Sequence, residues 1–402
     1  MLPPGVVGMT YRILVAHNAY KFLGGEDRVV ESEIELLRDR GHEVFEYRRH
    51  NDEIDSMSAI RAASDTLWST RTHAEVSETI KRLGIDLVHV HNTFPLISPS
   101  LYWAAASVKV PVVQTLHNFR LHCPQGMYLR EGKVCEDCIG RLPLPAIRHR
   151  CYRESTAQTT VLTAMLVMHR VIGTWQSKVD CYIALNEFCR DKFIQGGLPA
   201  DRIRIKPNFV DFPESAEGER KGFLYVGRLS EEKGIDCLLR AAAELPVGAL
   251  SVCGTGPKEA LVRAANHVRY LGSVGQDVIR DEMASASALV IPSVWYENFP
   301  RTLVEAFASG VPVIASRIGA LATIIEDGVT GMLFEPGNDA DLKRCLLWCS
   351  AHPEKLREMG RMAREAYERS YTPEQNYLSP IDIYHHTISR RAEKNTLSGQ
   401  GG

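Results

Sequence analysis

The stretch ALVIPSVWYENFPRTLVEAFASG, residues 288–310, decides the fold. Its first four residues form a short apolar run typical of a buried parallel strand, and a proline and a serine end that run. After a turn, residues 302–309 have the pattern of a helix, because a proline stands near the first turn and a glycine follows the end. Strand, turn and helix in this order indicate an α/β protein with a parallel sheet.

Two glutamates, Glu297 and Glu305, lie eight positions apart in this stretch, one in the turn and one in the helix. Acidic side chains near a helix start are ordinarily stabilising, because the unpaired N–H groups and the helix dipole favour negative charge. The same N–H groups can bind a diphosphate while the two carboxylates bind hydroxyl groups on either side of it. The pair alone leaves both interpretations open.

Length and composition indicate a globular protein with more than one domain. The chain has 402 residues, and single hydrophobic cores stop growing at about 250 to 300 residues. The net charge of −2 predicts no nucleic acid or other polyanionic partner. There is no apolar run of 18 residues and no signal-peptide pattern at the start, and most of the ten cysteines lie in apolar runs. We therefore expect a cytoplasmic protein with reduced thiols.

The same order of elements opens the chain. Residues 11–17 have the pattern of a buried strand, residues 22–28 form the turn FLGGEDR, and residues 29–40 have a helical pattern. Gly24 and Gly25 allow a sharp bend and a close approach of the backbone to a ligand, although a plain turn is an equal alternative. Strand, glycine turn and helix are the opening of a doubly wound nucleotide-type domain.

Two histidines follow predicted strands in this first half. His91 ends the strand DLVHVH and His117 follows the strand VPVVQTL. Open α/β sheets bind ligands at the carboxyl ends of their strands, so both histidines are candidates, with a structural role as the alternative. His117 also opens an insertion, residues 118–153, that is too long for an ordinary connection, and such loops tend to be functional.

This insertion contains four cysteines. Cys135 and Cys138 form a C-x-x-C pair, and Cys123 and Cys151 lie 12 and 13 positions away from it. Four thiolates with this spacing can bind a structural zinc ion. Free thiols in a loop are the alternative.

The insertion is also basic and leads into an apolar helical pattern at residues 155–175. An amphipathic helix that covers the sheet explains this pattern. A peripheral contact with the inner face of a membrane is the other interpretation. The basic residues are Arg141, Arg148, Arg150 and Arg153.

A polar linker at residues 213–221 precedes a second α/β unit. Its first strand, GFLYV, is followed by GRLSEEKG, in which Arg228 and Lys233 lie five positions apart around a turn. Two cations at the carboxyl end of a strand suit a pair of phosphates, because arginine binds bidentately and lysine supplies a point charge. Solvated surface charge is the alternative. Residues 373–391 predict a terminal helix and residues 392–402 a disordered tail.

Several motifs in this order resemble the family 4 retaining glycosyltransferases of the GT-B fold. The C-terminal half matches through VGRLSEEKG, GTGP, the E-x7-E element, EAFASGVPVIAS and DGVTGMLFEPGN, and the N-terminal half through GGED, HVHNTFP, TLHNFRLHCP and KPNFVD. The resemblance implies two Rossmann-like α/β domains facing across a cleft. Residues 9–212 would form the acceptor-side domain and residues 220–372 the nucleotide-sugar domain, with helix 373–391 packing back on the first.

The resemblance also implies roles for residues that match the motifs. Arg228 and Lys233 would hold the diphosphate of the donor and neutralise the leaving nucleotide without a divalent ion. Glu305 would accept the ribose hydroxyls, Glu297 would lie by the sugar ring and stabilise an oxocarbenium-like centre, and His117 would face the donor sugar or the acceptor hydroxyl. The remaining donor contacts would come from the GGED turn and the helix start: Gly24, Gly25, Asn298, Phe299, Pro300 and Arg301.

Two departures from the family pattern bear on these roles. Thr323 stands where an acid is frequent, and Asn118 follows His117 where many members have aspartate. The leading hypothesis is a cytoplasmic enzyme that transfers a sugar from a nucleotide-diphosphate-sugar to a carbohydrate or lipid-linked acceptor in polysaccharide or glycolipid assembly, with no cofactor for catalysis. A nucleotide-sugar epimerase of related fold and a nucleotide-sugar-binding protein without activity are the alternatives.

Overall fold

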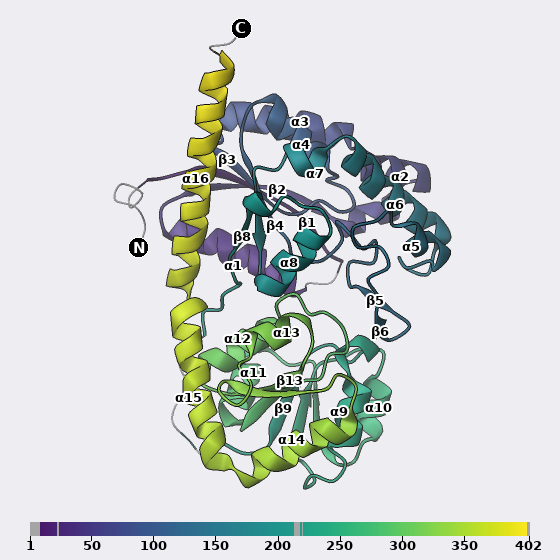
Figure 1. The fold of residues 1–402 in the computed structure, drawn as a ribbon, viewed down its shortest axis with the longest axis vertical. Coiled ribbons are helices and arrows are strands. Elements are labelled where there is room, and N and C mark those ends of the chain that lie inside the picture. The colour runs from purple at the N-terminus through teal and green to yellow at the C-terminus, as the bar shows by residue number, and fades with distance from the viewer. Residues whose placement is uncertain (1–8, 22–23, 213–217, 219, 400–402) are drawn as a thin grey trace. The chain divides into compact units, whose positions relative to one another are not determined.

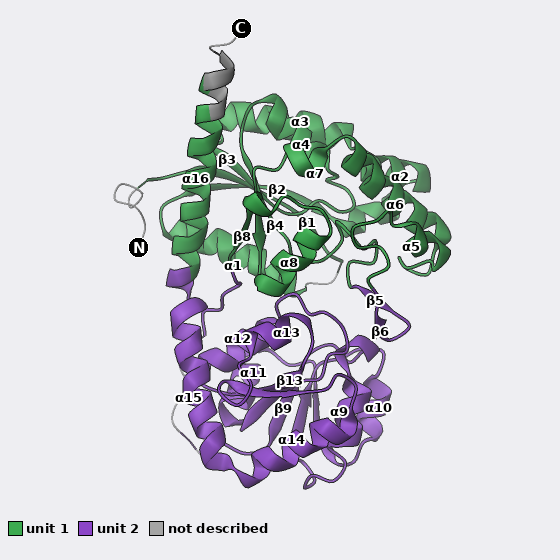
Figure 2. Cartoon of the chain, viewed as in Figure 1, with its two compact units in different colours: residues 1–127, 136–206, 376–402 green, residues 128–135, 207–375 purple. Residues whose placement is uncertain are grey.

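The computed structural model describes residues 9–21, 24–212, 218 and 220–399, and it divides the chain into two compact units (Figures 1 and 2). Unit 1 comprises Met1–Met127, Glu136–Lys206 and Asn376–Gly402. Unit 2 comprises Tyr128–Cys135 and Pro207–Gln375. The predicted linker falls largely on residues 213–217 and 219, which lie outside the described residues.

Unit 1 is built on a parallel sheet of six strands in the order β2-β1-β3-β4-β7-β8. The strand order reverses direction beside β1, so the carboxyl ends of β1 and β3 form the switch point where such sheets bind ligands. The strands are β1 (Arg12–Ala19), β2 (Glu43–His50), β3 (Leu87–Asn92), β4 (Val112–Thr115), β7 (Cys181–Ala184) and β8 (Ile203–Ile205). The helices are α1 (Gly25–Asp39), α2 (Ala59–Leu67), α3 (Thr70–Leu83), α4 (Ser100–Ser107), α5 (Leu144–Arg148), α6 (Thr156–Val171), α7 (Thr174–Ser177), α8 (Glu187–Gln195) and α16 (Pro373–Gly399).

The core of unit 1 joins the two ends of the chain. Ile13 of β1 and Ile34 of α1 belong to one buried cluster with Ile381 and Tyr384 of α16. Burial of each of these side chains contributes about 1.5 to 3 kcal/mol to the stability of the fold. These contacts explain why the terminal helix belongs to unit 1 from Asn376 onward. The helix also continues to Gly399, past the predicted end at residue 391, so the predicted disordered tail is helical over residues 392–399.

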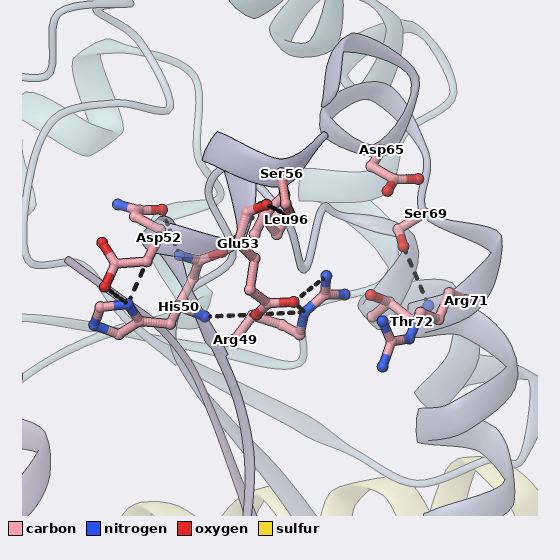
Figure 3. Close-up of polar contacts among 12 residues, drawn as sticks. Arg49, His50, Asp52, Glu53, Ser56, Asp65, Ser69, Arg71, Thr72 and Leu96 are labelled. Atoms are coloured by element: carbon pink, nitrogen blue, oxygen red, sulfur yellow. Dashed lines mark hydrogen bonds and ion pairs between the residues drawn. The ribbon is translucent and has the colours of Figure 1, made fainter. Parts of the chain in front are cut away.

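A network of polar contacts fixes the carboxyl end of β2 (Figure 3). The buried side chain of Arg49 donates from Nε to Glu53 at 2.9 Å, and Glu53 also accepts the backbone N–H of His50 at 2.9 Å. Glu53 belongs to a short 3-10 helix, η1 (Asn51–Ser56), so these bonds hold the turn against the strand. Nearby, the Ser69 hydroxyl caps α3 by accepting the N–H of Thr72 at 3.2 Å.

Unit 2 is built on a second parallel sheet of six strands, in the order β11-β10-β9-β12-β13-β14. In chain order this is 3-2-1-4-5-6, the doubly wound arrangement, and its switch point lies between β9 and β12. The strands are β9 (Phe223–Val226), β10 (Leu250–Cys253), β11 (Val268–Gly272), β12 (Ala288–Ile291), β13 (Val313–Ser316) and β14 (Gly331–Phe334). The helices are η3 (Glu231–Lys233), α9 (Ile235–Ala241), α10 (Glu259–Ala264), α11 (Gln276–Ser285), α12 (Arg301–Ala308), α13 (Gly319–Ile324), α14 (Asp339–Ala351) and α15 (Pro353–Ser370).

The insertion at residues 118–153 is not wholly irregular. It contains a small antiparallel hairpin of β5 (Leu129–Arg130) and β6 (Lys133–Val134), followed by α5. The hairpin lies in segment 128–135, which belongs to unit 2, whereas the rest of the insertion belongs to unit 1.

Each unit contains a parallel sheet of six strands with a switch point, so the predicted α/β fold with two doubly wound sheets is confirmed.

Candidate functional site

In unit 2, the switch point brings the GRLSEEKG turn and the E-x7-E element together. Strands β9 and β12 are neighbours, with Ala288 beside Phe223, so the segments that follow them meet at one edge of the sheet. Lys233, which ends η3, donates from Nζ to Glu297 Oε1 at 2.6 Å. Two predicted site residues that lie 64 positions apart therefore form an ion pair.

Glu297 is a buried acid with three donors. Ser293 Oγ lies 2.6 Å and Trp295 Nε1 3.1 Å from Oε1, the oxygen that also binds Lys233. The glutamate is 5% exposed, and the Lys233 ammonium lies over the Trp295 ring, 5.3 Å from its centroid. These contacts leave Oε2 outside the cluster of donors and fix the carboxylate in one orientation.

The close approach of Lys233 to Glu297 depends on a glycine. Gly234 has φ of +71°, in the left-handed region. A Cβ at this position would lie 1.8 Å from the carbonyl oxygen of Pro292, which directly follows β12. Only glycine lets the turn after β9 contact the end of β12, so this residue sets where Lys233 lies.

The second acid of the element, Glu305, is also paired. Arg301 donates from Nε to Glu305 Oε1 at 2.9 Å, and the two residues lie four positions apart on α12. Glu305 is 3% exposed and the Arg301 side chain is 26% exposed. Pro300 is the N-cap of α12 and has no side-chain acceptor, so the first N–H groups of the helix are available to an anion. Asn298 and Phe299, in the turn before it, are buried.

Arg228 differs from these residues because its side chain is exposed. Within the part of the chain that the structure describes, its guanidinium makes no ion pair. Its backbone carbonyl accepts the Tyr225 hydroxyl at 2.7 Å, which ties the turn to β9. Among the candidate residues of unit 2, Lys233 and Glu297 thus contact each other, and Arg228 lies in the turn that carries Lys233. Thr323, the departure noted above, donates its hydroxyl to Ala320 within α13.

In unit 1, His117 ends a chain of buried polar groups. Its Nε2 lies 2.9 Å from His91 Nδ1, and His91 Nε2 lies 3.4 Å from Glu33 Oε2. The other oxygen of Glu33 binds the ammonium of Lys206, which is fully buried. These groups come from four separate elements: His117 follows β4, His91 lies in β3, Glu33 lies in α1 and Lys206 directly follows β8. The sequence singled out the histidines and missed Glu33 and Lys206, which only long-range packing brings to them.

A carboxylate cannot donate, so it favours a proton on the ring nitrogen that faces it. His91 Nε2 faces Glu33 Oε2 at 3.4 Å, and neither atom makes a hydrogen bond among the described residues. We therefore assign the proton of His91 to Nε2, so that His91 Nδ1 accepts from His117 Nε2 and His117 Nδ1 keeps its lone pair. Burial lowers the pKa of both His91 and His117 well below 6.5, and charge on neighbouring histidines and Lys206 lowers it further. His117 is thus a neutral hydrogen-bond acceptor.

His91 and His117 line a pocket at the carboxyl ends of β3 and β4, of about 440 Å³ including its open mouth. Polar and aromatic groups share its wall: Asn92, Thr93, Phe94, Gln114, Asn118, Arg120 and Trp175.

The GGED turn begins α1 instead of preceding it. Gly24 is the N-cap with φ of −108°, Gly25 is the first helical residue, and neither lies in the left-handed region. Asp27 accepts the Gly24 N–H at 2.8 Å and starts the helix there, so neither glycine is needed for a left-handed conformation. Asp27 also contacts His17 Nε2 at 2.8 Å. A Cβ at Gly25 would meet no atom within 4 Å, and the approach of a ligand to this turn stays a prediction.

The four-cysteine zinc site stays a prediction. Cys123, Cys138 and Cys151 belong to unit 1, and Cys135 belongs to segment 128–135 of unit 2. Cys123 and Cys138 are buried, and the other two are half-buried.

Within the described residues, three potential metal ligands that do lie close together are Glu33, His89 and His91. His89 already bonds Thr115 Oγ1 at 2.8 Å and Tyr384 at 2.7 Å. Lys206 occupies one oxygen of Glu33. A metal ion would displace these partners, so the group fits a hydrogen-bond network. No helix of the described part of the chain is long and apolar enough to cross a membrane.

Both halves of the chain match glycosyltransferase families. Residues 23–212 match Glycosyltransferase Family 4 and residues 208–366 match Glycosyl transferases group 1. A solved structure of Anabaena Alr3699/HepE in complex with UDP-glucose has a TM-score of 0.63 at 18% identity and covers 97% of this chain and 100% of that one. Fold and motifs together define a glycosyltransferase of the GT-B fold.

Two curated relatives show which family of glycosyltransferases the chain belongs to. It is 32% identical to the sulfoquinovosyl transferase SQD2 of Arabidopsis thaliana, over 89% of this chain and 70% of that protein. It is 25% identical to the phosphatidyl-myo-inositol mannosyltransferase of Mycolicibacterium smegmatis, over 96% of each chain. The chain belongs to the family 4, group 1 glycosyltransferases. This membership favours a transferase over the epimerase and the inactive binding protein.

Proposed function

We propose that this enzyme transfers a sugar from a nucleotide-diphosphate-sugar to a carbohydrate or lipid-linked acceptor, with retention of configuration and without a divalent ion. The ion pair between Lys233 and Glu297 at the switch point of unit 2 carries the proposal, because it joins a phosphate-binding cation to a sugar-binding acid. Residues 220–372 would form the donor domain and residues 9–212 the acceptor domain.

The donor would lie along the carboxyl edge of the unit 2 sheet. Arg228 is exposed and without an ion pair among the described residues, and Lys233 is 26% exposed, so both cations are accessible to a diphosphate. The N–H groups at the start of α12 would bind its oxygens, and Glu305 would accept the ribose hydroxyls. The similarity to a protein solved with UDP-glucose supports a nucleotide-sugar donor.

In the transfer step, the bond between the anomeric carbon and the phosphate oxygen breaks, and the acceptor oxygen bonds to that carbon on the same face. A phosphate oxygen of the leaving nucleotide takes the acceptor proton. Lys233 and Arg228 would neutralise the leaving diphosphate, and Glu297 would stabilise positive charge on the sugar ring. His117 Nδ1 would accept a hydrogen bond from a hydroxyl of the donor sugar or of the acceptor without taking its proton, in agreement with its neutral state.

A membrane-bound or lipid-linked acceptor is supported by the exposed surface around α5 and α6. Leu144 on α5 is 58% exposed and Val171, the last residue of α6, is 78% exposed. Exposed apolar side chains beside Arg141 and Arg148 suit the inner face of a membrane with anionic lipids. A relative that acts on phosphatidyl-myo-inositol agrees with this choice and with a role in glycolipid or polysaccharide assembly.

The experiment is a thermal-shift panel of UDP-, GDP-, ADP- and TDP-sugars, followed by transfer assays in EDTA and anomeric assignment of the product by NMR. A donor that binds only the folded state raises the apparent Tm. Glu297→Gln should abolish transfer while the donor still raises Tm. Full activity of this variant, or inversion at the anomeric carbon, would contradict the proposal.

The same preparation tests the zinc site. A structural ion held by Cys123, Cys135, Cys138 and Cys151 predicts one equivalent of zinc in the purified protein, lost in a Cys135→Ser, Cys138→Ser variant. Zinc-free protein that is equally stable would leave the cysteines as ordinary thiols.

A further inference from the structure

Arg120 lies in the insertion just after His117 and has a buried guanidinium with few partners. Its Nε and Nη1 atoms are buried and have no hydrogen-bond partner in the described part of the chain. The group lies over two aromatic rings, 4.5 Å from the centroid of Phe94 and 5.6 Å from that of Tyr152. The backbone N–H of Arg120 donates to Asn118 Oδ1 at 3.1 Å, which fixes where the side chain starts.

This arrangement is unfavourable unless a ligand completes it. A buried charge without a hydrogen-bonding partner carries a desolvation penalty of several kcal/mol. Contacts with two aromatic faces return about 1 to 2 kcal/mol each when desolvated, and they satisfy none of the N–H groups. The rings hold the guanidinium in place while Nε and Nη1 stay without a hydrogen-bond partner.

Arg120 belongs to the pocket that also contains His117. Arg120 lines it together with His117, Asn118 and Phe94. The pocket lies at the carboxyl ends of β3 and β4, where open sheets bind ligands. A ligand whose hydroxyl donates to His117 can therefore reach Arg120 with a second group.

Glu26 of α1 attracts Arg120 electrostatically, but the two side chains form no ion pair within 4.0 Å among the described residues. Glu26 accepts the Tyr20 hydroxyl at 3.0 Å and Asn118 Nδ2 at 3.5 Å, and its Oε1 is buried without a partner. Burial raises the pKa of this carboxyl, which reduces its opposition to an incoming anion. Asn118 bonds both Glu26 and the backbone N–H of Arg120, which links the start of this side chain to α1.

We propose that Arg120 binds a phosphate group of the acceptor, in a subsite beside His117. The guanidinium presents several N–H donors, a geometry that matches phosphate oxygens. This inference rests on the proposed function, since it assigns the acceptor class of the same site. A phosphate that links a sugar to a lipid and the phosphate of a soluble sugar phosphate offer the same chemistry.

The test is calorimetric titration of the full chain with inorganic phosphate. The Arg228→Gln, Lys233→Gln variant serves as background, because it removes the phosphate site proposed for the donor. Adding Arg120→Gln should weaken phosphate binding at least tenfold, and Arg120→Lys should weaken it less, because lysine keeps the charge. Adding Arg12→Gln is the matched control: Arg12 also lies over an aromatic ring, Phe45 at 5.8 Å, but at the amino end of β1.

Octyl phosphate and glucose 6-phosphate then distinguish the two sources. Tighter Arg120-dependent binding of octyl phosphate supports a lipid-linked acceptor, and tighter binding of glucose 6-phosphate supports a soluble one. Phosphate binding that is unchanged by both Arg120 substitutions, or that Arg12→Gln weakens equally, overturns the subsite. Failure of the donor panel on the wild-type chain would instead overturn the proposed function, so the two failures are distinguishable.

Discussion

The two switch points of this enzyme use opposite electrostatics on the same kind of sheet. In unit 2, the site consists of charged pairs, Lys233 with Glu297 and Arg301 with Glu305, whose cations are each 26% exposed. In unit 1, the corresponding edge carries two neutral histidines, the buried His91 and the half-buried His117, beside a single cation among the described residues, Arg120. The charged pair of unit 1, Glu33 with Lys206, lies behind these histidines and is buried.

This difference matches the ligands proposed for the two edges. A leaving diphosphate gains negative charge during transfer, and fixed cations stabilise it. An acceptor hydroxyl needs a neutral acceptor that a low pH does not protonate, and His117 Nδ1 provides one. Substitutions in the two arrangements should therefore produce different losses of stability and of transfer activity.

The largest expected effect is acid unfolding of unit 1 before unit 2. Six histidines have lowered pKa values because they are buried; two values are about 4 for His89 and about 3 for His122. Below an unfolded pKa near 6.5, the unfolded state binds more protons, so stability falls as pH falls, by about 1.4 kcal/mol per histidine at pH 5.5. All six belong to unit 1: His42, His89, His91, His117, His122 and His169.

Peptide-resolved hydrogen exchange at pH 8 and pH 5.5, corrected for intrinsic rates, checks this order. Unit 1 peptides should lose protection while unit 2 peptides keep it, because several such losses approach the whole 5 to 15 kcal/mol of a domain. His122→Gln removes one titrating group and should reduce the loss of stability at pH 5.5 by the contribution of one histidine. Earlier opening of unit 2 would refute the assignment.

The second effect concerns the buried pair of Glu33 and Lys206. Lys206→Met leaves a buried carboxylate without its cation and should cost about 3 to 5 kcal/mol in urea unfolding. The double variant Glu33→Leu, Lys206→Met should regain most of this stability, because apolar side chains replace both charges. Transfer should stay low in the double variant, since His91 has lost its carboxylate. Recovery of both properties would show that the pair does not position His117.

The sequence predicted the parallel sheet of unit 2, and the candidate site residues of this unit lie in two short segments beside neighbouring strands. Lys233 and Glu297 could be placed from the ends of β9 and β12 alone. In unit 1, the histidines were predictable from strand ends, whereas Glu33 lies in the middle of a helix and looks like a surface acid in the sequence. Its burial depends on β3, β8 and α16, and no local pattern shows such contacts.

The third effect is loss of transfer in Lys233→Gln. Removing one cation from a leaving diphosphate should lower kcat/KM about 10²- to 10³-fold, with the fold kept because Ser293 and Trp295 still donate to Glu297. Lys258→Gln is the matched control, since Lys258 also pairs with an acid of unit 2, Asp236 at 3.2 Å, and its side chain is 37% exposed. Equal losses in both variants would indicate a general charge effect.

The smallest effect is expected at Arg301, which orients Glu305 without meeting the reacting atoms. Arg301→Gln removes the donor at 2.9 Å and frees a carboxylate that is 3% exposed, so ribose binding should weaken while the chemical step is kept. A tenfold increase in donor KM at unchanged kcat corresponds to about 1.4 kcal/mol, within the range for one charge-assisted hydrogen bond. Arg263→Gln, which removes an exposed pair with Glu259, should leave both constants unchanged. A lower kcat at constant KM would instead place Arg301 against the leaving phosphate, and the two charged pairs of unit 2 would then share one task.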